Sequence, residues 1–241
     1  MRNLQRVMGG LALVMAATAA AGPLKDLANQ LLTDPVKPAA AGLSDAEIGS
    51  GLREALAKGT KAAVTQLGRA DGFWGDERFR IPLPKPLARS EKLLRGFGAG
   101  DKLDAVHLAM NRAAEEAVPL AADVFSEAVR KLTLDDVRAI LTGPQDSATQ
   151  YFKRTTTDTL MAKFKPVVAQ VTGKLGLVQR YNAVLGSAGP LATSLGAPDL
   201  DDYVARKALD GLFARVADEE KDIRENPLAR TSDLLKKVFG S

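Results

Sequence analysis

The sequence predicts an all-α protein, with a single compact domain of about eight to ten helices that follows a cleaved signal peptide. Ala, Leu, Lys, Glu and Arg, which lose little entropy in a helix, are abundant in the 241 residues, whereas aromatic residues make up only 5%. Apolar residues also recur at helical spacing over most of the chain, and no repeat of fixed period indicates a solenoid.

The first 21 residues have the composition of a secretory signal peptide. Arg2 and Arg6 form a positive start, an apolar stretch runs from Val7 to Ala17, and small residues ending at Ala21 form a cleavage site. The stretch is shorter than the roughly 20 apolar residues of a membrane span, and the chain has no Cys to carry a lipid anchor. We therefore expect a periplasmic protein that is not a lipoprotein and has no transmembrane segment in its mature chain. The alternative is an uncleaved N-terminal anchor.

The composition also excludes several kinds of chemistry. With no Cys and one His, the chain lacks thiol nucleophiles, disulfides and multi-His metal sites. Without Arg2 and Arg6 it has 31 basic and 29 acidic residues, and this net charge of +2 is too small for a nucleic-acid binder. Familiar motifs for nucleotide binding, zinc-dependent cleavage and serine hydrolysis are absent. We expect no metal, no cofactor and no nucleic-acid partner.

Residues 22–42 are rich in Pro and Ala, and we predict that they form a flexible N-terminal arm. Residues 43–241 are predicted to form the helical domain. Ser44 and Glu47 have the spacing of a capping box, which starts a helix over 45–67. Thr133 and Asp136 have the same spacing at a second helix start. Further helices are expected over 87–97, 101–132 with an interruption at Pro119, 134–141, 147–173, 175–185, 201–225 and 231–239.

The segment 68–85 interrupts this pattern with glycines and prolines and contains the only Trp. A loop of this length is either functional or held on the core by its apolar residues. Phe73, Trp74 and Phe79 are interpreted as aromatics that pin the loop to the helices. A ligand surface is the alternative.

Asp199, Asp201 and Asp202 cluster at a helix start, where carboxylates stabilise the helix dipole or, alternatively, converge on calcium. We interpret them as helix-capping residues because the spacing of a calcium-binding loop is absent. His107 has no second His or Cys to share a metal, so we interpret it as structural.

Three of the expected helices carry polar residues beside their apolar stripe, at spacings that place each set on one face. Arg binds carboxylate or phosphate through a planar fork, so these faces together would suit a groove for an anionic or hydroxyl-bearing ligand. The alternative is a closed network of salt bridges that fixes helix packing. The candidate ligand-binding residues are Arg112, Glu115, Tyr151, Arg154, Tyr203, Lys207 and Asp210.

Several segments resemble an uncharacterised domain-of-unknown-function family of exported bacterial proteins. They are L-S-D-A-E-I-G-S-G-L-R-E-A-L (43–56), I-P-L-P (81–84), M-N-R-A-A-E (110–115), A-T-Q-Y-F-K-R-T-T (148–156), K-A-L-D-G-L-F (207–213) and A-R-T-S-D-L-L-K-K-V-F-G (229–240). The resemblance implies an all-helical domain after a signal peptide in a Gram-negative envelope, and it implies no catalytic residue or cofactor.

The leading functional interpretation is a non-enzymatic binding or interaction module of the periplasmic envelope, whose partner is a small molecule or an envelope protein. The polar groove between helices would be its site. The alternative is a periplasmic hydrolase or lyase that uses a carboxylate pair such as Glu115 with Asp210, since acid and base catalysis does not require His.

The leader generates a direct prediction. Protein isolated from its native host should begin at Gly22, or within a residue or two of it, because export removes the segment before that position. N-terminal sequencing measures this, and a preparation that still begins at Met1 would contradict it.

Overall fold

The computed structural model describes residues 44–187, 199–226 and 238. Every regular element within these residues is a helix, so the all-α prediction is confirmed. Residues 39–241 form one compact unit. The predicted signal peptide and N-terminal arm lie outside the described residues. Nearly all of the helix expected over 231–239, one of the eight to ten helices predicted, also lies outside them.

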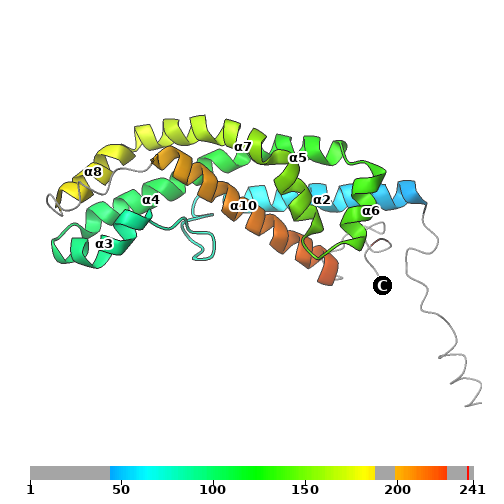
Figure 1. Cartoon of the computed structure of the whole chain (residues 1–241), viewed down its shortest axis with the longest axis horizontal. Helices are drawn as coiled ribbons and strands as arrows, with labels where there is room; N and C mark the ends of the chain where they lie inside the picture. The colour runs from blue at the N-terminus through cyan, green and yellow to red at the C-terminus, as the bar shows by residue number, and fades with distance from the viewer. Residues whose placement is uncertain (1–43, 188–198, 227–237, 239–241) are drawn as a thin grey trace, which may run out of the picture. The chain divides into compact units, whose positions relative to one another are not determined.

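From α2 to α8 the helices follow one another through short connections, apart from the long loop before α3 (Figure 1). Their bounds lie close to those predicted from apolar periodicity. The elements are α2 (Asp45–Leu67), α3 (Lys85–Gly96), α4 (Gly100–Ala117), the 3-10 turn η1 (Val118–Leu120), α5 (Ala121–Arg130), α6 (Leu134–Thr142), α7 (Ser147–Lys174), α8 (Leu177–Ser187) and α10 (Leu200–Glu225).

Two helix starts have the side-chain caps that the sequence predicts. The Glu47 amide donates to the Ser44 hydroxyl at 3.3 Å, and the Ser44 amide donates to the Glu47 carboxylate at 2.9 Å. Thr133 and Asp136 make the same reciprocal pair at the start of α6, with both distances 3.1 Å. These bonds satisfy amides that a helix start would otherwise leave unpaired, so both capping boxes are confirmed.

The core is one continuous apolar cluster, in which α7 and α10 make the most extensive contact of any two helices. The fully buried Phe125 and Phe152 join α5 to α7, with their ring centroids 5.0 Å apart. Phe213 of α10 lies 6.2 Å from Phe125. These aromatic contacts bring side chains of α5, α7 and α10 together in the core.

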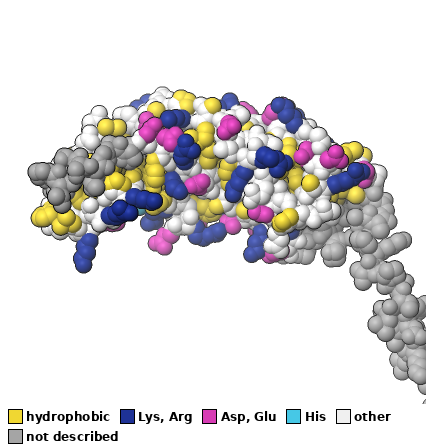
Figure 2. All heavy atoms as spheres, in the orientation of Figure 1, with side chains coloured by type: hydrophobic (Ala, Val, Ile, Leu, Met, Phe, Trp, Pro, Cys, Tyr) yellow, Lys and Arg dark blue, Asp and Glu magenta, His cyan; other side chains and the backbone are white. Residues whose placement is uncertain are grey.

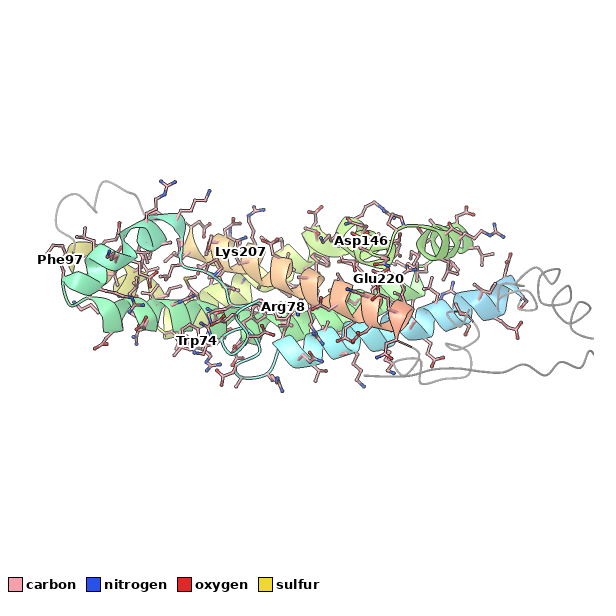
Figure 3. All side chains as sticks on the ribbon, turned by 90° about the horizontal axis from the view of Figure 1, so that it is seen from below. Trp74, Arg78, Phe97, Asp146, Lys207 and Glu220 are labelled. Atoms are coloured by element: carbon pink, nitrogen blue, oxygen red, sulfur yellow. The ribbon has the colours of Figure 1, made fainter. Side chains whose placement is uncertain are left out.

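The start of α7 is capped from another helix. Asp146 occupies the N-cap position as predicted, yet its carboxylate makes no cap and accepts from the Gln150 side chain instead. Glu220 of α10 takes this role, because its two carboxylate oxygens accept from the Ala148 amide at 3.0 Å and the Thr149 amide at 2.9 Å. Figure 3 labels Glu220 on α10 and Asp146 at the start of α7.

Arg224 balances the charge of the buried Glu220. Its guanidinium lies 2.9 Å from the Glu220 carboxylate, one turn away on α10, and the two side chains are only 16% and 5% exposed. The same guanidinium donates to the Ile140 carbonyl of α6 at 2.9 Å. One ion pair on α10 therefore holds the first turn of α7 and the last turn of α6.

Replacing Glu220 tests this arrangement. Glu220→Ala should lower the free energy of unfolding by about 3 to 5 kcal/mol, because it removes the acceptor of two helix amides and the carboxylate that balances a buried guanidinium. The urea midpoint at constant slope measures the loss. Glu225→Ala, which removes an exposed partner of Lys221, is the matched control and should cost less than about 1 kcal/mol. Equal midpoints for the two variants would contradict the prediction.

Candidate functional site

A surface cavity lies between α5, the start of α6 and the middle of α7, and we call it the α5–α7 groove. Its volume is about 710 Å³. Such a volume falls in the range of small-molecule sites, roughly 300 to 1,000 Å³. The lining residues are Asp123, Val124, Glu127, Ala128, Arg130, Lys131, Asp136, Tyr151, Arg154, Thr155, Thr156, Thr159 and Lys163.

The floor of the groove is apolar and rigidly held. Val124, Ala128 and Tyr151 are buried, and the Tyr151 hydroxyl donates to the Ala128 carbonyl at 2.9 Å. Burial raises the pKa of Tyr151, so its hydroxyl stays protonated and keeps this bond. The Tyr151 ring is therefore fixed as a wall between α5 and α7, and the guanidinium of Arg154 lies 5.7 Å from its centroid.

Two of the three carboxylates at the groove have partners within the domain. Glu127 pairs with Arg130 and Lys131, which together lower the pKa of Glu127. Asp136 accepts from the Thr133 hydroxyl and amide, and these bonds lower the pKa of Asp136. Both carboxylates stay ionised. The charge of Glu127 is balanced by its two cations, and Asp136 is held by its hydrogen bonds to Thr133.

The cations on the α7 side of the groove are less constrained. Arg154 is 67% exposed and reaches Asp136 only at 4.0 Å, a surface pair that contributes little. Lys163 is exposed, and in the described ranges no carboxylate lies within ion-pair distance of it. Both side chains are thus available to a ligand in the groove.

Tyr203, Lys207 and Asp210 lie in a different place, on the other flank of α7. They line a cavity of about 430 Å³ between α7 and α10, together with Lys153 and Thr157 among others. Lys207 pairs with Asp210 at 2.8 Å, and the Tyr203 hydroxyl donates to the Pro82 carbonyl at 2.9 Å. We call this cavity the α7–α10 pocket (Lys207 is labelled in Figure 3).

Arg112 and Glu115 line neither cavity, because they bind the loop before α3. Glu115 is buried, and one of its oxygens accepts from the Phe73 and Trp74 amides, both at 3.1 Å. Its other oxygen lies 2.6 Å from Arg112, which also pairs with Asp71 at 2.6 Å. Asp71 has a φ of 64°, a left-handed conformation that these contacts hold in place.

The seven predicted site residues are therefore divided over three places, and the structure does not bring them into one groove. The polar faces of α4, α7 and α10 point to different surfaces because the helices pack through their apolar stripes. The proposed pair of Glu115 and Asp210 is likewise not supported. Glu115 is occupied by loop amides and Arg112, and Asp210 is exposed and paired with Lys207.

Thr159 and Lys163 were not among the predicted site residues, although their spacing in the sequence marks them. Tyr151, Thr155, Thr159 and Lys163 follow one another every four residues, which places them in one row along α7. Among the predicted site residues, only Tyr151 and Arg154 line the groove. Polar residues in a row of period four were the better indicator of a surface groove.

Asn111 and His107 on α4 hold the loop together with Glu115. The Asn111 carboxamide accepts from the Ile81 amide at 2.8 Å, and the His107 Nε2 lies 2.7 Å from the Ile81 carbonyl. Phe73 and Phe79 are buried, whereas Trp74 is half-buried and packs edge-on against His107 at 5.0 Å. The interpretation that aromatics pin the loop is thus confirmed for the two Phe residues.

The acidic cluster before α10 is a cap, as expected. The Asp202 amide donates to the Asp199 carboxylate at 2.9 Å, and this bond lowers the pKa of Asp199. Lys165 pairs with Asp199 at 3.1 Å and with Asp202 at 3.3 Å, and the Thr172 hydroxyl donates to Asp201 at 2.6 Å. Over residues 44–187 and 199–226 no group of side chains has the arrangement of a metal site.

These observations define the class of protein as an all-helical domain with a long loop that is bound to α4. The chain belongs to the family described as "Protein of unknown function (DUF4197)", whose model matches residues 42–240. The family resemblance seen in the sequence is therefore confirmed. The curated proteins and the solved structures that were compared with the chain gave no match. None of the helices in the described part of the chain is both long and apolar enough to cross a membrane.

The half-buried position of His107 predicts a pH dependence of stability. Desolvation lowers the pKa of His107 below its ordinary 6.5, so the unfolded chain binds this proton more tightly than the folded one. The contribution to stability is complete above pH 6.5 and is lost as the pH falls toward the lower folded value. Since the chain has a single His, an NMR titration reads it directly. A pKa at or above 6.5 would contradict the prediction, and His107→Gln should remove this part of the pH dependence.

Proposed function

We propose that the protein is an exported, non-enzymatic envelope protein that binds a small molecule or a segment of an envelope partner in the α5–α7 groove. The single observation that carries the proposal is this groove, with an apolar floor, hydroxyl groups and available cations. The leader at residues 1–21 supports delivery to the periplasm.

The groove has the anatomy that small-molecule sites share. Such sites are concave and mostly apolar, with a few polar groups that fix orientation. Here Val124, Ala128 and the Tyr151 ring provide the apolar surface, while Thr159 and Lys163 add a hydroxyl and an ammonium group. An elongated ligand could lie along α7, because residues in a four-residue row are about 6 Å apart on a helix.

The charges favour a ligand with an anionic group. Glu127 and Asp136 already have partners, and Asp123 lies in the first turn of α5, where the helix dipole balances a carboxylate. Arg154 and Lys163 remain for the ligand, and a guanidinium presents a planar fork to carboxylate or phosphate. An apolar body on the floor and an acidic group at these cations would satisfy both parts of the site.

Filling the groove tests the proposal. The protein is mixed with a small-molecule extract of the host periplasm and washed by filtration, and the retained molecules are identified by mass spectrometry. Thr159→Trp should abolish retention of the wild-type ligand, because the indole occupies the groove. Lys163→Glu should weaken retention about tenfold or more through loss of a charge-assisted contact.

The opposite flank of α7 provides the matched control. Thr157→Trp places the same side chain in the α7–α10 pocket and should leave retention unchanged. Loss of the ligand with Thr157→Trp but not with Thr159→Trp would move the site to the α7–α10 pocket and contradict the proposal. Retention of no molecule by the wild-type protein would contradict a small-molecule ligand in the groove.

A further inference from the structure

The outward face of α3 combines basic and apolar side chains. Lys85, Arg89 and Lys92 follow one another at helical spacing on the side of α3 opposite the buried Leu87 and Leu94, and all three cations are exposed. None of the three has an ion-pair partner in the described chain. They form a row of free positive charge along one helix.

Large apolar side chains flank this row. Leu93 is 54% exposed and Phe97, directly after the helix, is 65% exposed. Val178, on the contacting helix α8, is 50% exposed. We call Lys85, Arg89, Lys92, Leu93 and Phe97 together the α3 face. Among the large hydrophobic side chains of the described residues, Leu93, Phe97 and Val178 have the highest exposed fractions. All three lie on or directly beside α3 and α8.

Phe97 lies in an open part of the surface, between two glycines. Phe97 stands between Gly96 and Gly98, and no atom lies within 4 Å of the position that a Cβ would take at either glycine. Gly98 has a φ of 76°, which turns the chain sharply into α4. The turn presents the Phe97 side chain at one end of the domain, as Figure 3 shows.

Positive charge is concentrated around the same helices. Residues 85–104 and 174–187 contain seven Lys or Arg and three Asp or Glu, a net charge of +4. The chain from residue 22 has a net charge of only +2, so the rest of it carries two more acids than bases. Glu91 and Asp104 are both paired with Arg95. Figure 2 shows dark blue and yellow side chains beside one another at the α3 end.

We propose that the α3 face binds the surface of an anionic lipid bilayer, with Leu93 and Phe97 entering the interface and the cations contacting lipid headgroups. Helices that lie in a membrane interface have this combination of a basic face and large apolar residues. An anionic surface attracts each Lys or Arg close to it, and three cations in a row act together. The α5–α7 groove is formed by other helices, so this contact does not depend on ligand binding there.

Vesicle flotation tests the proposal. Residues 39–241 form a compact unit, so a chain that begins at Gly22 keeps the whole domain and omits the apolar leader. This chain should float with vesicles of mixed phosphatidylglycerol and phosphatidylcholine, and binding should weaken as salt is added. It should bind vesicles of phosphatidylcholine alone at least tenfold more weakly. Absence of binding to the anionic vesicles would overturn the proposal in favour of a protein partner at this face.

Two variants separate the charges from the apolar side chains. A variant with Lys85→Gln, Arg89→Gln and Lys92→Gln should lose about tenfold or more of the partition coefficient on anionic vesicles. A second variant, with Leu93→Ser and Phe97→Ser, should also lose about tenfold, because the interface buries both residues. If only the charge variant lost binding, the contact would be electrostatic alone, and insertion of Leu93 and Phe97 would be refuted.

Matched controls remove the same groups elsewhere. Lys61→Gln, Arg69→Gln and Lys221→Gln remove three exposed cations of α2, the loop after it and α10, and Leu134→Ser removes an apolar residue that is 49% exposed on α6. Neither control should change the partition coefficient more than about twofold. A loss in the cation control equal to that of the α3 variant would show general charge attraction and overturn the proposal. All substitutions are at exposed positions, and circular dichroism checks that the fold is retained.

Discussion

The packing of this domain depends on the carboxylate of Glu220. A helix start leaves backbone amides without partners, and Ala148 and Thr149 in the first turn of α7 are buried, where water does not replace those partners. Glu220 accepts from two of these amides, and Arg224 balances its charge and binds α6. The longest helix is thereby held against α10. Because both cavities border α7, their shapes depend on this contact.

Glu115 solves a similar problem for the loop before α3. The loop lacks regular structure of its own, and its Phe73 and Trp74 amides would be costly to bury without an acceptor. Glu115 supplies that acceptor from α4, and the Phe73 ring then packs against Gly211 of α10, where a Cβ would approach to 2.7 Å. The two buried glutamates therefore have structural partners, and the features that suit binding lie on the surface of α7 and on α3.

Local signals in the sequence predicted most of the helices but not their contacts. The capping boxes at Ser44 and Thr133 and the break at Pro119 depend on neighbouring residues, so they were readable. Glu220 lies in the run D-E-E-K-D, which looks like a solvated helix face, and its partner amides are more than 70 residues away. The seven residues predicted to share one groove are divided among three places for the same reason. Spacing in the sequence places residues on one face of a helix, but it does not determine which way that face turns in the packed domain.

Native-state amide hydrogen exchange tests the role of the two glutamates most directly, because it reads the amides that they cap. If the two glutamates cap these amides, those of Ala148 and Thr149, and those of Phe73 and Trp74 in the loop, should exchange as slowly as amides in the middle of α7 and α4. Glu220→Gln should accelerate exchange at the first pair and leave the second pair protected. Exchange of all four amides at the rate of exposed loop residues in the wild-type protein would contradict the account.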